Sequence, residues 1–198
     1  MRTSLVAVLA TTLATPAFAL VAEQVSEPAS GVKFDTEIGD LRLLGTGLRT
    51  KTFLKVKVYA VGLYVDPKAL ADYRGKGATP ELYKSLVWGD FHREIRMKFI
   101  RDGIDAKTIR GAFEESLGGT DASLREKFLG CFGDVKTGDE YILRWIPGTL
   151  EIVVAGQAKP PISDKAFASA VFAIWLGDKP IQADIKRGLV SRAGTVLQ

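Results

Sequence analysis

The sequence predicts an α+β fold, with a large antiparallel β-sheet and a layer of α-helices on one of its faces. Residues 53–65 form a long run rich in Val, Leu, Phe and Tyr, which is typical of a β-strand. Residues 94–99 alternate between apolar and charged side chains, whereas residues 104–117 follow a helical period. Such segments follow one another in blocks, strands then helices then strands then helices, without a βαβ repeat. That order favours an antiparallel sheet with its helices packed on one face.

The N-terminal residues have the features of a secretory signal peptide. Arg2 gives a positive start, residues 5–13 form a short apolar run, and residues 17–19 (Ala-Phe-Ala) fit a cleavage site. We therefore expect residues 1–19 to be removed and the protein to be periplasmic or secreted. An uncleaved anchor is the alternative, although the apolar run is too short to span a bilayer.

The rest of the chain is predicted to be one domain. Residues 20–31 are polar and are expected to be a flexible lead-in, and residues 32–198 form the domain itself. No other segment resembles a membrane-spanning helix. Loss of Arg2 with the signal peptide lowers the formal net charge from +4 to +3, and basic and acidic residues are interspersed. We therefore expect no nucleic-acid partner.

The sequence offers few residues for metal or nucleophilic chemistry. It contains one histidine, His92, and one cysteine, Cys131, which are too few for the usual zinc sites. Cys131 lies among apolar neighbours and is predicted to be buried and inert. His92 is expected to be a surface or hydrogen-bonded residue. Residues 45–47 (Gly-Thr-Gly) precede a strand and lack the third glycine of a dinucleotide site. We therefore expect no metal and no cofactor.

The first half of the domain is predicted to be mainly β-structure. Residues 32–35 and 41–44 are expected to form the arms of a hairpin around residues 38–40. Residues 45–49 (Gly-Thr-Gly-Leu-Arg) are predicted to be a tight turn that places its arginine at the entrance of the long strand. From Tyr59 onward both faces of that strand are apolar, which predicts burial on both sides.

Two prolines mark short helices after the long strand. Asp66-Pro67 and Thr79-Pro80 each combine an N-cap residue with a proline at the first helical position, and the second helix is predicted over residues 81–84. The strand at residues 94–99 is expected to keep one face in water. Residues 86–91 are expected to form a hairpin or bent strand with it.

The second half of the domain is predicted to contain two helices, three strands and two further helices. Glycines end the first and third of these helices, at Gly118-Gly119 and Gly177. The predicted helices cover residues 104–117, from Thr120 or Asp121 through Phe132, residues 164–176 and about 180–188, and the predicted strands cover residues 141–146, 149–155 and 157–159.

Two motifs resemble the chalcone isomerase family. Residues 45–49 followed by residues 57–65 (KVYAVGLYV) are similar to the family pattern G-x-G-x-R and a long strand that ends in G-[VL]-Y-[LV]. Residues 172–181 (FAIWLGDKPI) are similar to a second signature, a helix ending in [IL]-G. The resemblance extends over residues 32–189. It implies a large antiparallel sheet and a helical layer that enclose a cleft.

The resemblance also implies which residues line that cleft. In the plant enzymes an arginine binds the phenolate, and Thr and Tyr side chains help to polarise the ketone. Arg49 matches the family arginine, and Tyr59 replaces the strand threonine with a larger hydroxyl side chain. The polar pair of the C-terminal helix falls on Ile174 and Trp175. An alignment without a gap places Asp105, Thr108 and Ala112 where the family has Tyr, Lys and Asn, and a slip of one residue would restore Lys107.

These replacements argue against efficient chalcone cyclisation, because the loss of one well-placed donor typically costs ~3 kcal/mol of transition-state stabilisation. An apolar cleft with a guanidinium at its mouth instead favours an amphipathic or planar apolar ligand, such as a fatty acid. Non-catalytic relatives of this fold bind fatty acids. Arg49 and Tyr59 are the candidates for any catalysis, and the predicted ligand-binding residues are Arg49, Tyr59, Val61, Thr108, Phe113, Ile174 and Trp175.

Other interpretations of the same residues stay open. The protein is alternatively an isomerase or intramolecular lyase for a substrate other than a chalcone, or an accessory protein that binds a partner. A filled core without a ligand, and an Arg49 that pairs with a surface carboxylate, are the simplest alternatives. The sequence leaves the oligomeric state open.

Overall fold

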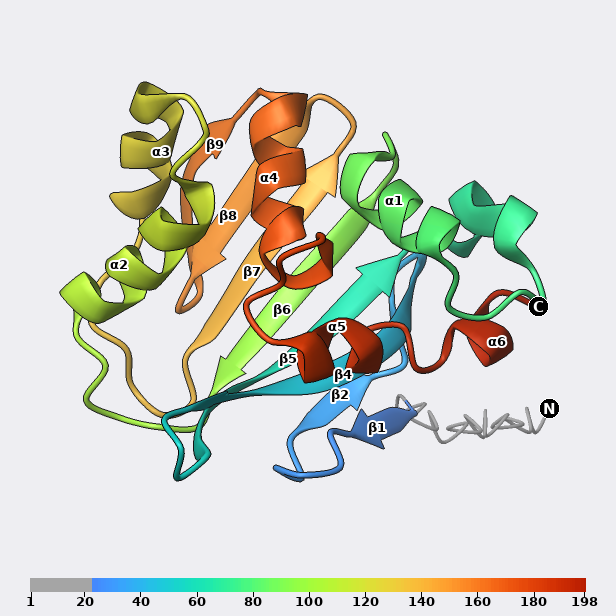
Figure 1. Cartoon of the computed structure of the whole chain (residues 1–198), viewed down its shortest axis with the longest axis horizontal. Coiled ribbons are helices and arrows are strands. Elements are labelled where there is room, and N and C mark those ends of the chain that lie inside the picture. Colours follow the sequence, from blue (N-terminus) through green and yellow to red (C-terminus); the bar gives the residue numbers. More distant parts are fainter. Residues whose placement is uncertain (1–22) are drawn as a thin grey trace, which may run out of the picture.

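The computed structural model describes residues 23–198 and shows a seven-stranded antiparallel sheet with helices on one face (Figure 1). The strands follow the chain in order, and each pairs with the next. The predicted fold class is therefore confirmed. The strands are β3 (Glu37–Ile38), β4 (Leu41–Lys51), β5 (Val56–Val65), β6 (Arg93–Phe99), β7 (Glu140–Ile146), β8 (Thr149–Val154) and β9 (Gln157–Ile162).

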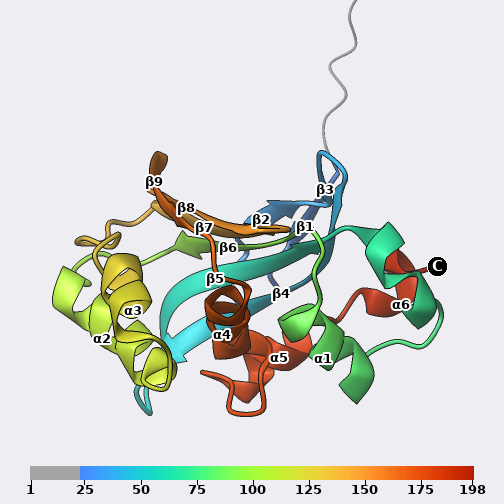
Figure 2. The same ribbon diagram turned by 90° about the horizontal axis from the view of Figure 1, so that it is seen from above.

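The helices lie together on one side of this sheet, as the view from above shows (Figure 2). Asp and Thr side chains accept hydrogen bonds from backbone N–H groups at the start of five of them, at the predicted Asp66 and Thr79 among others. The helices are the 3₁₀ helix η1 (Pro67–Tyr73), α1 (Pro80–Trp88), α2 (Ala106–Leu117), α3 (Ala122–Leu129), α4 (Lys165–Leu176), α5 (Ala183–Gly188) and α6 (Ala193–Val196).

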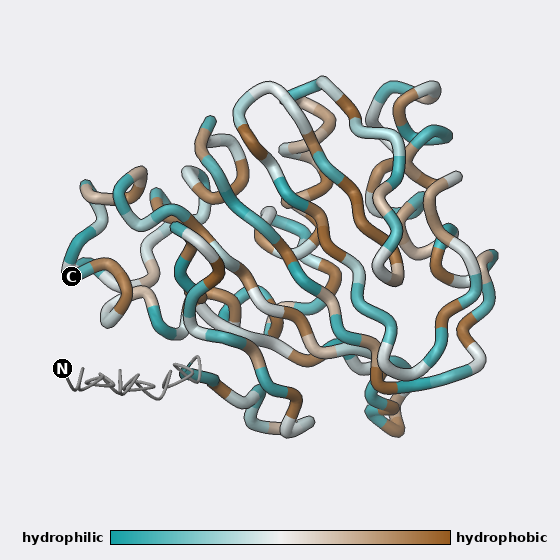
Figure 3. The backbone as a smooth tube through the Cα atoms, turned by 180° about the vertical axis from the view of Figure 1, so that it is seen from behind, coloured by the Kyte–Doolittle hydropathy of each residue, from teal (hydrophilic) through white to brown (hydrophobic). Residues whose placement is uncertain are grey.

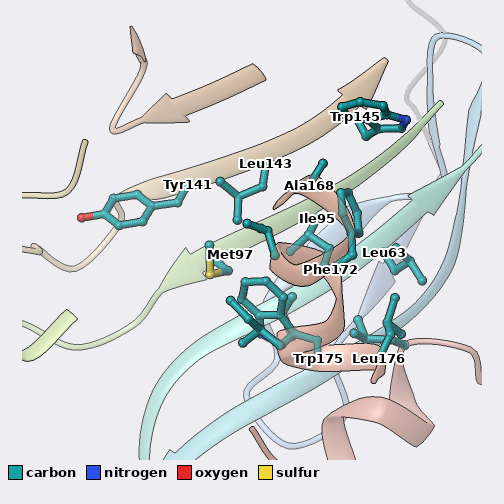
Figure 4. Close-up of a cluster of buried hydrophobic side chains, with 14 of the residues drawn as sticks. Leu63, Ile95, Met97, Tyr141, Leu143, Trp145, Ala168, Phe172, Trp175 and Leu176 are labelled. Atoms are coloured by element: carbon teal, nitrogen blue, oxygen red, sulfur yellow. The ribbon is translucent and has the colours of Figure 1, made fainter. Parts of the chain in front are cut away.

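The main core fills the space between the sheet and the helices. Alternate residues of β5, β6 and β7 point towards α4, because side chains on a strand change face with a period of two (Figure 4). Ile95 and Met97 of β6 meet Phe172 and Trp175 of α4, and all four are at most 1% exposed. At about 25 cal/mol per Å² of buried apolar surface, such contacts dominate the stability of the fold.

A second, smaller core lies on the opposite face of the sheet. The strands β1 (Gln24–Ser26) and β2 (Lys33–Asp35) pair with each other and cover part of that face. Phe34 packs over Gly62 of β5 so closely that a Cβ at Gly62 would lie 2.8 Å from its ring. The predicted burial of β5 on both faces is confirmed.

Several predicted boundaries are wrong near the N-terminus. The arm at residues 32–35 pairs with β1, and the two-residue strand β3 takes its place in the hairpin with β4. Part of the predicted flexible lead-in, residues 24–26, is the strand β1. The pairing of β1 with β2 depends on contacts with the back of the sheet, which local sequence patterns do not show.

The segment around β6 also differs from the prediction. Residues 86–88 belong to α1, where a strand was expected, because a short apolar run fits a helix and a strand equally well. The charged face of β6 is only partly exposed to solvent. Glu94 is fully buried and forms ion pairs with Arg96 and Arg144. His92 lies in the connection between α1 and β6, where its backbone carbonyl accepts a hydrogen bond from Asp66.

The later elements agree more closely with the sequence. The predicted strand at residues 157–159 continues to Ile162 through two prolines, which the edge position of β9 permits. The last predicted helix is shorter and begins at Ala183. The predicted signal peptide, residues 1–19, lies outside the described residues. Among residues 23–198, no helix combines the length and the apolar character that crossing a membrane requires.

Candidate ligand-binding site

The site lies where β4 and β5 join, between these strands, α2 and the connection from α4 to α5. It is a cavity of about 240 Å³ with mainly apolar walls. The lining residues are Arg49, Lys51, Thr52, Val56, Val58, Tyr59, Arg101, Ile104, Thr108, Ile109, Ala112, Phe113 and Ile181.

A wider and more polar groove adjoins this cavity. The groove has a volume of about 1090 Å³ and runs between α2 and the C-terminal half of α4. The two spaces share Arg49, Lys51, Thr108, Ala112 and Ile181, so these residues form the boundary between them.

A pair of glycines brings the α4–α5 connection to this site. The Gly-Thr-Gly-Leu-Arg segment is part of β4, and the prediction of a tight turn there is wrong. A Cβ at Gly45 would overlap the carbonyl oxygen of Gly188, and a Cβ at Gly47 would lie 3.0 Å from the Cα of Ile185. The glycines therefore serve the close approach of α5 to the strand, and the chain turns later, at residues 52–55.

Arg49 and Tyr59 face the helices from neighbouring strands. They are direct partners in the register of β4 and β5, which places both side chains on the same face of the sheet. The register shifts between Arg49 and Thr50, and this β-bulge turns both Val58 and Tyr59 towards the cavity. Bulges re-aim side chains in this way at many functional sites.

The Tyr59 hydroxyl is buried and accepts a hydrogen bond from the Trp175 indole N–H at 3.1 Å. Burial raises the pKa of Tyr59, while the bond from Trp175 and the positive charge of Arg49 partly oppose that shift. The hydroxyl therefore stays protonated at neutral pH. Within residues 23–198 its proton has no acceptor, so it can donate a hydrogen bond to a group in the cavity.

Arg49 is half-buried and held by the segment that precedes α5. Its Nη1 donates to the Ile181 carbonyl oxygen at 3.2 Å and to Gln182 Oε1 at 3.3 Å. Gln182 Oε1 also accepts from the Thr50 N–H, and its amide donates to the Leu48 carbonyl. Arg49 forms no ion pair within residues 23–198, which argues against a surface carboxylate partner. Its Nε and Nη2 have no partner in that part of the chain.

The helix α2 supplies the opposite wall. Its cap Asp105 fixes the first turn by accepting from the Thr108 N–H at 2.7 Å, and Thr108 then faces both the cavity and the groove. Phe113 is buried one turn later and makes ring contacts with Phe132 at 4.8 Å and Trp175 at 6.2 Å between centroids. The aromatic cluster behind Phe113 closes the cavity on the core side.

The structure brings together four of the seven predicted site residues. Arg49, Tyr59, Thr108 and Phe113 line the cavity, and Ile174 lines the adjoining groove. Val61 and Trp175 are fully buried and line neither space, and Trp175 acts through its bond to Tyr59. Their roles in ligand binding stay predictions, because no ligand contact tests them.

Three cationic residues lie at the rim, and two of them, Lys51 and Arg101, were not predicted, whereas Lys107 was considered only for an alignment slipped by one residue. Lys51 and Arg101 line the cavity beside Arg49, and Lys107 lines the groove. The contribution of Lys51 and Arg101 could have been found only from the fold, because the register of β4 and β5 and the loop after β6 bring them together. The cavity lining contains no Asp or Glu. Its chemistry therefore suits an anionic head group with an apolar body.

The remaining reactive residues lie elsewhere. Neither His92 nor Cys131 lines the cavity or the groove. Cys131 is buried as predicted, and burial raises the pKa of its thiol, which makes the nucleophilic thiolate scarcer. Among residues 23–198, no three His, Cys, Asp or Glu side chains gather as metal ligands would.

Fold and site together define a class of protein: a seven-stranded antiparallel sheet and a helical layer that enclose a small apolar cavity with an arginine at its mouth. The chain belongs to the chalcone isomerase-like family, because the family profile of that description matches residues 26–191.

Similar proteins include both binding proteins and enzymes. Fatty-acid-binding protein 1 of Arabidopsis thaliana is 26% identical, over 89% of this chain and 73% of its own length. Chalcone–flavanone isomerase 1A of Glycine max is 27% identical, over 87% of this chain and 89% of its own length. A crystal structure of an Arabidopsis thaliana fatty-acid-binding protein superposes with a TM-score of 0.75 at 22% identity, covering 88% of this chain and 99% of the other. This likeness confirms the chalcone isomerase-like fold.

Proposed function

We propose that this protein binds a fatty acid or a similar amphipathic carboxylate, with the apolar tail in the cavity and the carboxylate at Arg49. One observation carries the proposal: the mainly apolar cavity has Arg49, Lys51 and Arg101 in its lining and no acidic residue. A carboxylate gains charge-assisted hydrogen bonds at such a mouth, and the tail leaves water. The similarity to a protein named fatty-acid-binding protein 1 supports this ligand class.

The hydrogen bonds of Arg49 leave free the edge of the guanidinium that can bind a carboxylate. Both bonds to the chain use Nη1, so the Nε and Nη2 groups are available to donate two parallel bonds. The bonds to Ile181 and Gln182 hold the side chain in place before the ligand arrives, which lowers the entropy cost of binding. The Tyr59 proton adds a third donor on the same face.

The size of the cavity constrains how the ligand lies. About 240 Å³ is below the ~300–1,000 Å³ typical of ligand pockets. A long acyl chain therefore extends past Ile181 and Ala112 into the adjoining groove, or moves a wall residue aside. Shorter chains fit the cavity alone.

The location of the protein is part of the proposal. The apolar run and cleavage site of residues 1–19 support export, with a mature chain that begins at Leu20. N-terminal sequencing of the protein from its own host checks this, and a folded protein that still begins at Met1 contradicts it.

Arg49 variants test the binding proposal. The loss of a charge-assisted hydrogen bond is worth ~1.5–3 kcal/mol, so Arg49→Ala should weaken fatty-acid affinity about tenfold to a hundredfold. Arg49→Lys should recover only part of the affinity, because an ammonium cannot donate two parallel bonds. Titration calorimetry with fatty acids of several chain lengths measures both effects.

Arg192→Ala is the matched control. Arg192 is also half-buried and bonded to a backbone carbonyl, that of Leu43 at 2.9 Å, but it does not line the cavity or the groove. This variant should lose stability and keep its affinity. An Arg49→Ala protein with unchanged affinity and a large loss of melting temperature would show that Arg49 is structural, and would sink the proposal.

An intramolecular lyase is the second candidate, favoured by the similarity to a chalcone–flavanone isomerase. Besides the guanidinium of Arg49, the cavity lining offers a developing oxyanion few uncharged hydrogen-bond donors, Tyr59 and Thr108 among them. We expect purified protein not to accelerate chalcone cyclisation above the background rate in an absorbance assay. Turnover that Arg49→Ala abolishes would replace the binding proposal with the enzymatic one.

A further inference from the structure

The turn between β4 and β5 exposes two large apolar side chains. Phe53 is 92% exposed and Leu54 is 70% exposed, the highest values for large apolar residues among residues 23–198. They are the two central residues of a β-turn closed by a hydrogen bond from the Lys55 N–H to the Thr52 carbonyl at 3.1 Å. Gly, Asn, Asp, Pro and Ser usually occupy such positions. Phe and Leu at this place contribute nothing to the core, so their role lies outside the fold.

The backbone of this turn is held in an unfavourable conformation. Thr52 has φ 65° and Lys55 has φ 51°, in the left-handed region that β-branched and long side chains avoid. Conformations of this kind persist where the surrounding structure imposes them, and they concentrate at functional positions. The turn presents Phe53 and Leu54 to the exterior.

Lysines surround the apex. We call residues 51–57 the hairpin tip; it contains the exposed Lys51, Lys55 and Lys57. Residues 41–65 contain no Asp or Glu. Lys51 and Lys55 form no ion pair within residues 23–198, and Lys57 donates to the uncharged carbonyl of Ala29. The positive charge of the hairpin tip is therefore uncompensated.

The hairpin tip is also the edge of the cavity. Lys51 and Thr52 belong to the cavity lining, together with the exposed Arg101 from the loop after β6. The hairpin projects beyond the sheet next to the end of the molecule that carries α2 (Figures 1 and 2). The hydropathy colouring shows brown, apolar residues on this projection between teal, hydrophilic ones (Figure 3).

We propose that the hairpin tip docks on an anionic lipid membrane. Phe53 and Leu54 enter the boundary between head groups and acyl chains, and the three lysines and Arg101 lie at the level of the phosphates. Apolar anchors flanked by basic residues bind anionic interfaces by these two contributions together. Docking would place the mouth of the cavity at the membrane surface.

The charge favours a lipid surface over other occupants. A second copy of this chain would bring two sets of lysines together, and the repulsion would oppose such a dimer. Two side chains at a narrow apex would also bury far less surface than the ~800 Å² per partner of a stable protein interface. Docking of the hairpin tip on a membrane does not depend on whether the cavity binds a fatty acid.

A fluorophore at the apex tests the proposal at the position concerned. Leu54→Cys labelled with an environment-sensitive dye should show a blue shift and higher emission with vesicles of phosphatidylcholine and about one-third phosphatidylglycerol. Cys131 is buried, which directs labelling to the new cysteine. Ile146→Cys is the matched control, because Ile146 is 39% exposed at the β7–β8 turn and distant in sequence from the hairpin tip. Its label should not respond. No response at position 54, or an equal response at both positions, overturns the proposal.

Binding measurements on unlabelled protein separate the two contributions. Phe53→Ser/Leu54→Ser should weaken vesicle binding by about tenfold or more, and Lys55→Gln by severalfold, in flotation assays. Lys68→Gln, at an exposed position of η1, is the control for charge and should bind as wild type. Binding should fall on raising the salt to about 0.5 M, where charges are screened. Membrane docking is contradicted if the Phe53→Ser/Leu54→Ser variant binds vesicles like wild type. It is also contradicted if this variant differs from wild type only in its oligomeric state, measured by light scattering.

Discussion

Buried tyrosines make the stability of the protein depend on pH in the alkaline range. Tyr141 is 1% exposed, and burial raises its pKa from 10.0 to about 12, with Asp139 and Asp134 adding to the shift. In the unfolded chain the same phenol ionises near pH 10. Below that pH the burial of the neutral phenol contributes fully to stability, and the contribution is lost progressively as the pH rises from about 10 to about 12.

Tyr141→Phe should therefore lose less stability in alkali than wild type. The variant keeps the ring that packs on Phe99 at 4.7 Å between centroids, but it has no proton to lose. Urea unfolding at pH 8 and at pH 11 gives the two free energies. Tyr73→Phe, at a half-buried tyrosine outside the main aromatic cluster, is the control. The same loss of stability in wild type and Tyr141→Phe would contradict this account.

Single-residue roles in the site were only partly predictable. Arg49 and Tyr59 followed from a motif, and the structure places them together at the cavity. Outside the site, the buried Arg93 of the core was not identified at all. It shares the apolar face of β6 with Ile95, is fully buried, and donates to the Val87 carbonyl at 3.0 Å at the end of α1. Its guanidinium also lies 4.4 Å from the Phe172 ring. Phe172 comes from a distant segment, and Val87 lies at the end of a helix where a strand was expected, so the local pattern showed only a charged residue.

The contact between β4 and α5 is the main link between elements at the site. Gly45 and Gly188 meet backbone to backbone, and α5 thereby carries Ile181 and Gln182 to Arg49. In the sequence alone, two glycines before an arginine suit a turn equally well. Only the position of the C-terminal helices shows that the glycines are needed for close approach.

Gly45→Ala should disrupt this link. The new methyl group would overlap the Gly188 carbonyl and lie 2.7 Å from the carbonyl carbon of Leu189, so α5 must move. Overpacking of this kind typically costs ~1–3 kcal/mol in the free energy of unfolding. Fatty-acid affinity should fall as well, because the partners of Arg49 move with α5. Denaturant unfolding and calorimetry measure the two effects.

Gly111→Ala, on the helix α2, should have the opposite effect on the free energy of unfolding. A Cβ at Gly111 of α2 would meet nothing within 4 Å. This variant should gain ~0.5–1 kcal/mol, because Ala favours the helix over Gly. Equal stability of Gly45→Ala and wild type would show that α5 does not depend on the glycine contact.

The whole fold was predicted better than the details of its boundaries. Period-two and helical patterns, with caps at Asp66 and Thr79, gave the order of the elements and the antiparallel class. Two things depended on long-range packing and stayed hidden. One is the β1–β2 pair, which covers the back of the sheet through Phe34. The other is the pair of cations beside Arg49 at the rim of the cavity, Lys51 of β4 and Arg101 of the loop after β6.

A side chain that fills the cavity tests whether the cavity holds one fatty acid. Ala112 lines both the cavity and the groove, so Ala112→Trp should fill the space that the acyl chain needs. Glu114→Trp, on the exposed side of the same helix and outside both linings, is the matched control.

Native mass spectrometry of the protein from its own host, with extraction and identification of the bound molecule, is the most direct measurement. We expect wild type and Glu114→Trp to carry one fatty acid per chain, and Ala112→Trp to carry none while it keeps the melting temperature of a folded protein. Wild type without any bound acid after incubation with fatty acids, or Ala112→Trp with the same occupancy as wild type, would contradict the account.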